Sequence, residues 1–415
     1  MKHLKIRIII AILLNLFGVK SFAYDISVEN KDGVTIYYNY VNDGKELSVT
    51  YGNGNHKYKD HVTIPETVTY KNRTRTVVSI GESAFWANSE LKSVTMCNTI
   101  KSIGTQAFYS CKNLNKLTIP DAVESIGEEA FKSSGLTLIT MGKGLKHIGK
   151  NIFSNCKPII IVKDIASWCE CEFDTPPFEN SYVGNSTHLQ LNIDEKTELT
   201  NLVIPNGVKK INPYAFGCCK SLKSITIPNS IESIGFGAFI SLKNLEIINI
   251  GNGVTSIGNI AFRYCEKLNS LIIPNNVRTI GKRAFSDCRQ LKYLILGYGV
   301  SEISSAAFDN INNLETITSY IKEPFVISND TFTKETFYNT SLFVPKGTAE
   351  KYKNTGGWQN FLWIEEGVPS AIEKVVDDSI DIKKYYNLQG RLSLQPHKGL
   401  NIIMSGGTKK RIYVK

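Results

Sequence analysis

A phenylalanine recurs along the chain at almost constant intervals. It falls at Phe85, Phe108, Phe131 and Phe153 and then, after a gap, at Phe216, Phe239, Phe262, Phe285 and Phe308. The intervals are 23, 23 and 22 residues, then 63, then 23 four times. An Ile stands five residues before each of these Phe residues. A period of this length predicts a solenoid, because one repeat is too short to bury its own apolar face and must stack on its neighbours.

The segment 222–239, LKSITIPNSIESIGFGAF, shows what one repeat can build. Its first two Ile residues alternate with Thr226, as in a short strand with one buried face. Pro228 then ends strand hydrogen bonding and turns the chain. A second Ile pair follows, and Phe239 fills the core. One repeat is therefore one turn of a solenoid, and stacked turns place equivalent strands side by side in a parallel sheet.

The remaining segments differ from the repeats in pattern. Residues 24–79 are predicted as a β-rich N-terminal cap, with a hairpin signal at Asp43-Gly44. Residues 80–312 hold the repeats, and an irregular unit at about 157–198 is predicted as a distorted turn with a surface excursion. Trp168 in this unit is interpreted as a core plug, with a ligand platform as the alternative. The chain then divides into a last repeat and C-terminal cap (313–366), a linker (367–384) and a C-terminal β module (385–415).

The first residues have the pattern of a secretory signal peptide. Lys2, Lys5 and Arg7 precede an apolar run at 8–17, and Ala23 offers a small residue for cleavage, so residues 1–23 are predicted as the signal. A transmembrane anchor is the alternative, but neither this run nor any later one reaches the roughly 18 apolar residues that span a bilayer. We expect an exported protein, secreted or at the cell surface, with no transmembrane segment.

The net charge of +10 is concentrated at the two ends. Residues 1–23 hold four basic side chains and residues 383–415 hold eight, with no acid in either segment. The body, 24–382, therefore has a net charge of −2. A nearly neutral body gives no broad electrostatic surface for phosphates, so no nucleic-acid partner is expected.

The nine cysteines mostly follow the repeat. Five of them stand three residues after a repeat Phe, where other repeats have Asn88, Ser134, Leu242 or Ile311. This pattern predicts a small buried slot that a thiol fills well. A disulfide framework is the alternative in an exported protein, and Cys265 and Cys288 would lie one strand spacing apart.

The repeat unit L-x-x-L-x-I-P-x-x-V-x-x-I-G-x-x-A-F-x-x-C-x-x-L, at 91–153 and 199–314, resembles the BspA-type bacterial leucine-rich repeat. The resemblance implies an α/β repeat solenoid, β-rich, with a parallel sheet on one face. It also implies a surface or secreted protein that binds other proteins, including host matrix or other cell surfaces, without catalysis. Pro occupies the turn where the commonest leucine-rich repeats have Asn, so no Asn ladder is carried over. The tail resembles C-terminal modules that direct secretion in anaerobic Gram-negative bacteria, which makes 385–415 a possible sorting signal.

Catalytic and metal-binding patterns are absent from the sequence. Residues 144–151, GLKHIGKN, approach a phosphate-binding loop but end in Asn151 where Ser or Thr must ligate magnesium, and Ile148-Gly149 is in repeat register. The six histidines show no metal-ligand spacing, and no nucleophile signature occurs. We therefore expect no catalytic residue, no metal and no cofactor. Catalytic residues can also be distant in the sequence and meet only in the folded chain, so an enzyme is the third hypothesis.

Strand residues between the buried positions should point outward, and most are small or hydroxylic. The exceptions are predicted to form one apolar ligand-binding patch beside Thr226 and Thr318: Ile247, Ile272, Tyr293 and Ile295. Strand propensity alone, or a covering loop, is the alternative explanation.

The sequence thus predicts a non-enzymatic repeat protein for protein binding or adhesion. The second hypothesis is a carbohydrate-binding surface module, which requires Tyr293, Trp358 and Trp363 to lie exposed in a row.

Overall fold

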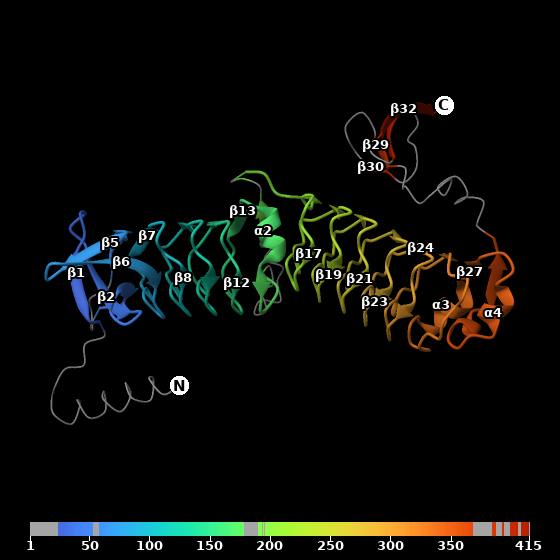
Figure 1. The fold of residues 1–415 in the computed structure, drawn as a ribbon, viewed down its shortest axis with the longest axis horizontal. Coiled ribbons are helices and arrows are strands. Elements are labelled where there is room, and N and C mark those ends of the chain that lie inside the picture. The colour runs from blue at the N-terminus through green and yellow to red at the C-terminus, as the bar shows by residue number, and fades with distance from the viewer. Residues whose placement is uncertain are drawn as a thin grey trace, which may run out of the picture. The chain divides into compact units, whose positions relative to one another are not determined.

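The computed structural model describes residues 24–52, 58–177, 190–192, 194 and 196–367, together with the backbone of the C-terminal strands at 384–386, 392–393, 399–405 and 408–414. The chain forms two compact units. Unit 1 comprises 1–223 and 235–243, and unit 2 comprises 224–234 and 244–415. The predicted signal peptide, 1–23, lies outside the described residues, as does nearly all of the predicted linker. Figure 1 shows the coils of each unit packed side by side.

Unit 1 begins with strands that do not belong to the regular repeat. The predicted hairpin joins β2 (Thr35–Val41) to β3 (Glu46–Thr50), and Asn42, Asp43 and Gly44 all have positive φ in its turn. β3 pairs in parallel with β6, which starts the repeat ladder through β8. The other strands of this region are β1 (Ile26–Glu29), β4 (Asp60–Thr63), β5 (Thr67–Tyr70) and β6 (Arg73–Ile80).

Each regular coil of unit 1 has one strand of the main sheet and one short strand on its return side. The main-sheet strands are β7 (Leu91–Thr95), β9 (Lys116–Thr118), β11 (Leu138–Met141), β13 (Ile159–Val162), β15 (Gln190–Asn192) and β16 (Asn201–Val203). The short strands are β8 (Ser102–Ile103), β10 (Ser125–Ile126), β12 (His147–Ile148), β14 (Glu172–Phe173) and β17 (Lys210–Ile211). Equivalent strands pair in parallel, as in Lys116↔Leu138↔Ile159.

Unit 2 repeats this plan and ends with short helices. Its main-sheet strands are β18 (Ser224–Thr226), β20 (Ile247–Asn249), β22 (Ser270–Ile273), β24 (Tyr293–Leu296), β26 (Thr316–Ser319), β27 (Ser341–Val344) and β28 (Trp363–Glu366). Its short strands are β19 (Ser233–Ile234), β21 (Ser256–Ile257), β23 (Thr279–Ile280) and β25 (Glu302–Ile303). The helices are α3 (Lys334–Asn339), α4 (Ala349–Lys353) and the 3₁₀ turn η1 (Trp358–Asn360).

Four strands lie in the predicted C-terminal module, the first beginning at Lys384, the last residue of the predicted linker. They are β29 (Lys384–Tyr386), β30 (Leu392–Ser393), β31 (Gly399–Ser405) and β32 (Thr408–Val414). They pair antiparallel, in the order β30-β29-β31-β32.

The recurring Phe rings stack face to face through each unit. In unit 1, Phe85, Phe108 and Phe131 follow one another at 4.9 and 5.8 Å between ring centroids. In unit 2, Phe285 stacks on Phe308 at 5.5 Å with the planes only 4° apart. The nine repeat Phe side chains are all among the largest fully buried ones. These rings form the core that the period predicted, in two runs in unit 1, Phe85 to Phe153 and Phe216 to Phe239, with the irregular unit between them.

The turn around each Phe has an unusual backbone. The residues two before and two after every repeat Phe have positive φ, as at Gln106 (53°) and Ser110 (55°) around Phe108. Alternating left- and right-handed conformation points every second N–H toward the next coil. Thus Gln106, Phe108 and Ser110 donate to the carbonyls of the next coil at 2.8–2.9 Å. We call this set of inter-coil bonds the turn ladder.

The turn ladder ends in unit 2 at a carboxylate. In the coil of Phe308, the Phe308 N–H still donates to the Thr331 carbonyl at 2.9 Å. The preceding donor, the Ala306 N–H, has no such carbonyl and instead donates to Asp330 Oδ1 at 3.3 Å. Ser305 Oγ donates to the other carboxylate oxygen at 2.7 Å. The Asp330 carboxylate therefore replaces a carbonyl of the next coil as the acceptor for the Ala306 N–H.

The cysteine slot is buried, as predicted. Cys111, Cys156, Cys219, Cys265 and Cys288 are at most 4% exposed, and all nine cysteines are free thiols. Cys111 Sγ donates to the Phe85 carbonyl at 2.9 Å, and Cys288 Sγ donates to the Phe262 carbonyl at 3.4 Å. Burial raises the pKa of Cys111 and Cys156 to about 12. These thiols are hydrogen-bonded core residues and not half-cystines.

The irregular unit contains a helix that the sequence analysis did not identify. Helix α2 (Ile165–Glu170) starts at Asp164, whose side chain accepts from the Ala166 N–H. Trp168 on this helix is 3% exposed and donates its indole N–H to the Ala215 carbonyl at 2.8 Å. Its interpretation as a core plug is therefore confirmed. The predicted surface excursion falls largely on 178–189, outside the described residues.

Candidate functional site

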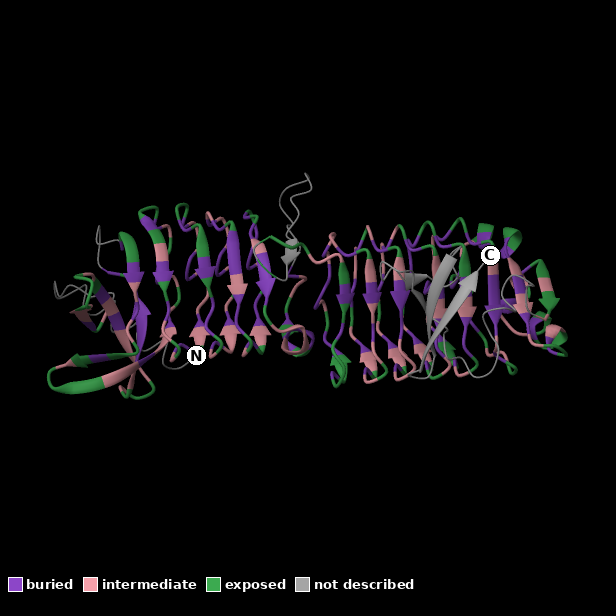
Figure 2. Ribbon diagram, turned by 90° about the horizontal axis from the view of Figure 1, so that it is seen from above, coloured by how far each residue is buried: buried purple, intermediate pink, exposed green. Residues whose placement is uncertain are grey.

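The predicted patch lies on the side of the unit 2 sheet that faces away from the Phe core. We call this side the outer face. Buried and partly exposed residues alternate along its strands, as Figure 2 shows by colour. Leu294 on β24 is 1% exposed, whereas its neighbour Tyr293 is 41% exposed. The alternation confirms that the strands present one residue in two to the outside.

The strand register arranges the outer-face residues of β22 to β28 in two rows. The first row is Ser270, Tyr293, Thr316, Ser341 and Trp363, and the second row is Ile272, Ile295, Thr318, Phe343 and Glu365. Direct partners in neighbouring strands lie about 4.8 Å apart. Ile272 and Ile295 are such partners, so the structure brings these two predicted residues together.

Ile247 does not lie beside Ile272, as the predicted patch requires. The period makes Ser270 its counterpart on the next coil, so Ile247 belongs to the first row and is offset by two residues from Ile272. Ser270 therefore stands between Ile247 and Tyr293. The four predicted residues occupy outward strand positions, but β20 and β22 belong to different hydrogen-bonded sheets, and only the Ile272–Ile295 pair is in direct register.

Tyr293 is held in position by charged neighbours. Its hydroxyl donates to Glu315 Oε2 at 3.1 Å, and Lys292 Nζ donates to Glu315 Oε1 at 2.9 Å. The hydrogen bond from Lys292 lowers the pKa of Glu315, and that from Tyr293 adds to the effect. A partly exposed ring with a fixed hydroxyl loses little conformational entropy on binding, which favours Tyr at interfaces.

The sequence analysis missed Phe343 and did not place Trp363 on this face. Phe343 is half-buried in the second row, next to Thr318, and Trp363 is 59% exposed at the end of the first row. Phe343 follows Thr318 by 25 residues, because α3 interrupts the 23-residue period. Thr318 between Ile295 and Phe343 is only 1% exposed. The accessible apolar surface of the second row is thus made by Ile272, Ile295 and Phe343.

The same repeat positions in unit 1 carry different side chains. β7 presents Ser93 and Thr95, and β9 presents Lys116 and Thr118. Apolar residues do occur further along: Leu138 and Ile161 are each only 8% exposed, whereas Val203 on β16 is 64% exposed. Exposed aromatic side chains on the main sheet are therefore a property of unit 2 among the described residues.

The repeat matches a known family model. Residues 61–171 and 192–315, more than half of the chain, match the BspA type leucine rich repeat region in six copies. The chain belongs to this family. The BspA-type repeat accounts for the buried Leu, Ile and Phe positions and leaves the two rows of the outer face unspecified.

Solved structures of several bacterial proteins are similar to the chain at low sequence identity. The pneumococcal vaccine antigen PcpA is 17% identical, and the match covers 83% of this chain and all of that chain with a TM-score of 0.44. A leucine-rich repeat protein from Bacteroides ovatus is 23% identical over 71% of this chain and 94% of that chain, with a TM-score of 0.29. A leucine-rich repeat protein of T. pallidum is 22% identical, with coverages of 56% and 87% and a TM-score of 0.34. A search of curated proteins gives no match.

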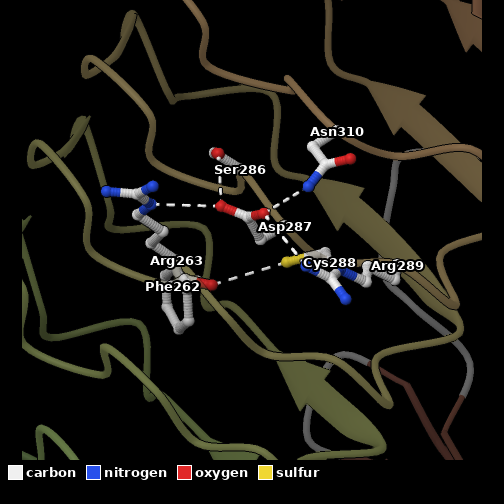
Figure 3. Close-up of polar contacts among 7 residues, drawn as sticks. All are labelled: Phe262, Arg263, Ser286, Asp287, Cys288, Arg289 and Asn310. Atoms are coloured by element: carbon white, nitrogen blue, oxygen red, sulfur yellow. Dashed lines mark hydrogen bonds and ion pairs between the residues drawn. The ribbon is translucent and has the colours of Figure 1, made fainter. Parts of the chain in front are cut away.

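Unit 2 of this BspA-type protein also contains a buried carboxylate, which tests the enzyme hypothesis. Asp287 is 6% exposed and accepts hydrogen bonds from Arg263, Ser286 and Asn310, with Arg289 at 3.8 Å (Figure 3). Burial alone would raise the pKa of Asp287, but these hydrogen bonds outweigh it and lower the pKa. The carboxylate joins three successive coils and lines none of the described grooves. Its geometry is that of a structural clamp.

The near miss for a phosphate loop is part of the BspA-type repeat. The Gly149 N–H donates to the Ile126 carbonyl at 2.8 Å, so it is not available to a phosphate. A Cβ at Gly149 would lie 2.6 Å from the Glu128 nitrogen, which explains the glycine by the close approach of two coils. Among the described residues, no group of three or more His, Cys, Asp or Glu could hold a metal ion. No helix in the same residues is long and apolar enough to cross a membrane.

Proposed function

We propose that this BspA-type protein is an exported, non-enzymatic protein that binds other proteins through the outer face of unit 2. The observation that carries the proposal is the register of its two rows. Ile272 and Ile295 are direct partners in the second row, which also contains Phe343. Tyr293 and Trp363 lie in the neighbouring first row. Apolar and aromatic side chains on a rigid sheet are the residues that dominate protein interfaces.

The fixed geometry of the face supports this role. The strands β24, β26 and β27 are each paired on both sides, and β22 and β28 are the two edges of this five-stranded sheet. Glu315 accepts a hydrogen bond from the Tyr293 hydroxyl, which fixes the side chain before a partner binds. Binding to a preformed surface avoids the entropy cost of ordering it.

Export and adhesion belong to the same proposal. The signal-peptide pattern at 1–23 supports transport out of the cytoplasm. Membership of the BspA-type family supports a place at the cell surface or in the medium, where the partners would be host matrix proteins or the surfaces of other cells.

The carbohydrate hypothesis requires three exposed rings in a row, and one of them, Trp358, is buried. Trp358 is 0% exposed and donates its indole N–H to the Phe325 carbonyl at 2.9 Å. Tyr293 and Trp363 remain exposed in one row, but Thr316 and Ser341 separate them by about three strand spacings, roughly 14 Å. The observations on the outer face therefore favour a protein partner.

The test is a binding measurement with the full chain on purified host matrix proteins, such as fibronectin and laminin, and on bacterial surface extracts. The double variant Tyr293→Ser/Ile295→Ser removes one residue from each row and should weaken binding at least about 10-fold, because it truncates two interface anchors. Circular dichroism would show that the variant keeps its fold.

The matched control is Lys116→Ser/Thr118→Ser, at the same repeat positions in unit 1. This control should change affinity by less than about twofold. A folded Tyr293→Ser/Ile295→Ser protein that binds as well as the original chain would refute the proposed face.

A further inference from the structure

A second surface of unit 2 has the features of a ligand site and does not rest on the proposed function. It is a groove of about 840 Å³ at the turns that follow β22, β24 and β26. We call it the turn groove. Its lining includes the aromatic residues Tyr298, Tyr320 and Phe325 and the cations Arg278 and Lys322. The groove crosses three successive coils, so a ligand in it would contact residues from each of them.

The turn groove opens where the chain departs from its own repeat. In earlier coils of unit 2 an Asn follows the strand-ending turn, and its side chain accepts the next coil's N–H, as Asn229 Oδ1 does from Asn252 at 2.9 Å. This is an Asn ladder at a position that the sequence analysis did not consider. Asn275 continues it to the Tyr298 N–H at 3.3 Å, and there the amide is replaced by an aromatic ring. Tyr298 is 63% exposed.

The polar groups of the groove are not all used by the protein. The Tyr320 hydroxyl is buried and has no hydrogen-bond partner among the described residues. A buried hydroxyl without a partner leaves its hydrogen-bonding capacity unused. Arg278 and Lys322 form no ion pair within the described part of the chain, whereas the carboxylate of Glu323 is held by Lys351. The groove therefore presents uncompensated positive charge.

The backbone of these turns leaves little for a peptide to pair with. The Tyr298 N–H is bound by Asn275, the Ser301 N–H donates to the Arg278 carbonyl at 2.9 Å, and the Tyr320 N–H donates to the Leu296 carbonyl at 2.9 Å. Strand addition, the usual way to bind an extended peptide by its backbone, needs free main-chain groups. Recognition in this groove must come from rings, amides, hydroxyls and cations of side chains.

The geometry points to the turn groove as a binding site for an acidic saccharide, a glycan whose pyranose carries a carboxylate. The exposed Tyr298 ring offers a flat face for the C–H side of a sugar ring. Asn276 and Ser301 donate to the Asn252 and Arg278 carbonyls and keep side-chain oxygens that can accept from sugar hydroxyls. Arg278 and Lys322 offer cations for the carboxylate. The two cations would recognise the carboxylate by charge, and the Tyr298 ring would recognise the pyranose by stacking.

A groove in unit 1, at the ends of β7 and β9 and the turns that follow them, supplies an internal comparison. It has a volume of about 610 Å³ and is lined by no aromatic residue. Its Lys163 lies 3.7 Å from the Asp121 carboxylate, so that cation is compensated. The same architecture without a ring and without free charge should not bind the ligand.

The test is calorimetric titration of the full chain with 3′-sialyllactose, with a hyaluronan hexasaccharide, with lactose and with a hexamer of glutamate. The two acidic sugars separate sialic acid from uronic acid as the source of the carboxylate. At least one of them should bind about 10-fold more tightly than lactose, because a charge-assisted pair is worth about one decade in affinity. Equal affinity for lactose, tighter binding of the glutamate hexamer, or no binding of either acidic sugar would overturn the inference.

Variants locate the site. Tyr298→Asn restores the residue that the three preceding coils have at this position, so the variant should keep its fold. Its affinity for the acidic sugar should fall about 5- to 10-fold. Arg278→Gln and Lys322→Gln should each reduce the preference for the acidic sugar over lactose. The controls Lys163→Gln in unit 1 and Tyr338→Asn outside the turn groove should leave affinity unchanged. Equal losses in the controls, or none in the Tyr298, Arg278 and Lys322 variants, would overturn the assignment.

Discussion

The two units use one repeat to make two different surfaces. At the same repeat positions, unit 1 presents Thr95 and Lys116 where unit 2 presents Ile272 and Tyr293. Inside, both units stack Phe on Phe and bury a thiol or its substitute in one slot. The repeat therefore fixes the core, and function has to be sought where outward residues depart from the repeat.

The largest expected effect tests what the units share. Phe131→Ala in unit 1 and Phe285→Ala in unit 2 each remove a ring that is 0% exposed and stacked between two others. Each should lower the free energy of unfolding by about 3–5 kcal/mol, because the cavity cannot close between flat rings. Urea denaturation of the two variants and of the exposed control Tyr338→Ala would measure it. A cost below about 1 kcal/mol in one unit would break the equivalence of the two cores.

The next effect should appear in unit 2 alone. Asp287→Asn removes the charge that joins the coils of Arg263 and Asn310, and should cost about 2 kcal/mol of unfolding free energy at pH 7. Because the folded-state pKa of Asp287 is lowered, its contribution is present above the unfolded-state pKa and is lost as the pH falls through the folded-state pKa.

The difference between Asp287→Asn and the original chain should therefore shrink as the pH falls below about 4. Urea midpoints at pH 7, 5 and 3 would show this, with the exposed substitution Glu302→Gln as the control. A difference that stays constant over this range would show that the charge of Asp287 does not contribute.

The smallest effect is a gain in stability, and a reciprocal exchange between units tests it. Ile260 has φ +49°, a conformation that β-branched residues adopt only with strain, and Asn151 occupies the same position of its coil at φ +56°. Ile260→Asn should raise the unfolding free energy by about 1 kcal/mol, and Asn151→Ile should lower it by a similar amount. Thermal melts of both variants would measure the two shifts. Changes of the same sign would show that contacts of these side chains outweigh backbone strain.

The sequence predicted the features of the fold that depend on residue type at fixed spacing. Phe108 and its equivalents, the buried thiol at Cys111 and the outward position of Tyr293 all follow from the period. The positive φ at Gln106 and Ser110 could not be predicted, because residues as different as Glu129, Ile260 and Arg283 occupy equivalent positions. Backbone geometry there is imposed by the inter-coil bonds and not by local preference.

The candidate site was predicted only in part, and the reasons are geometric. Ile272 and Ile295 could be paired because both lie in regular coils. Ile247 was assigned to the patch because aligned strands were expected to bring successive turns together, whereas the 23-residue period places it in the first row, as the counterpart of Ser270. Phe343 was missed because α3 shifts its coil out of the period, and the Tyr320 hydroxyl shows its lack of partner only in three dimensions. Phe343 could have been found by aligning the strand LFV at 342–344 with its predecessors instead of counting 23 residues.

The turn ladder makes the two ends of a stack chemically unlike. Its donors all point toward the following coil, so the leading side of any stack presents carbonyls and the trailing side presents N–H groups, one of which Asp330 accepts in unit 2. A whole coil inserted anywhere inside a stack leaves every donor matched to an acceptor. Only the terminal coils need side chains made for the purpose. Such a molecule can be lengthened or shortened by duplication or deletion of 23-residue blocks without redesign of its interior, whereas a reversed or partial block would have no place in it.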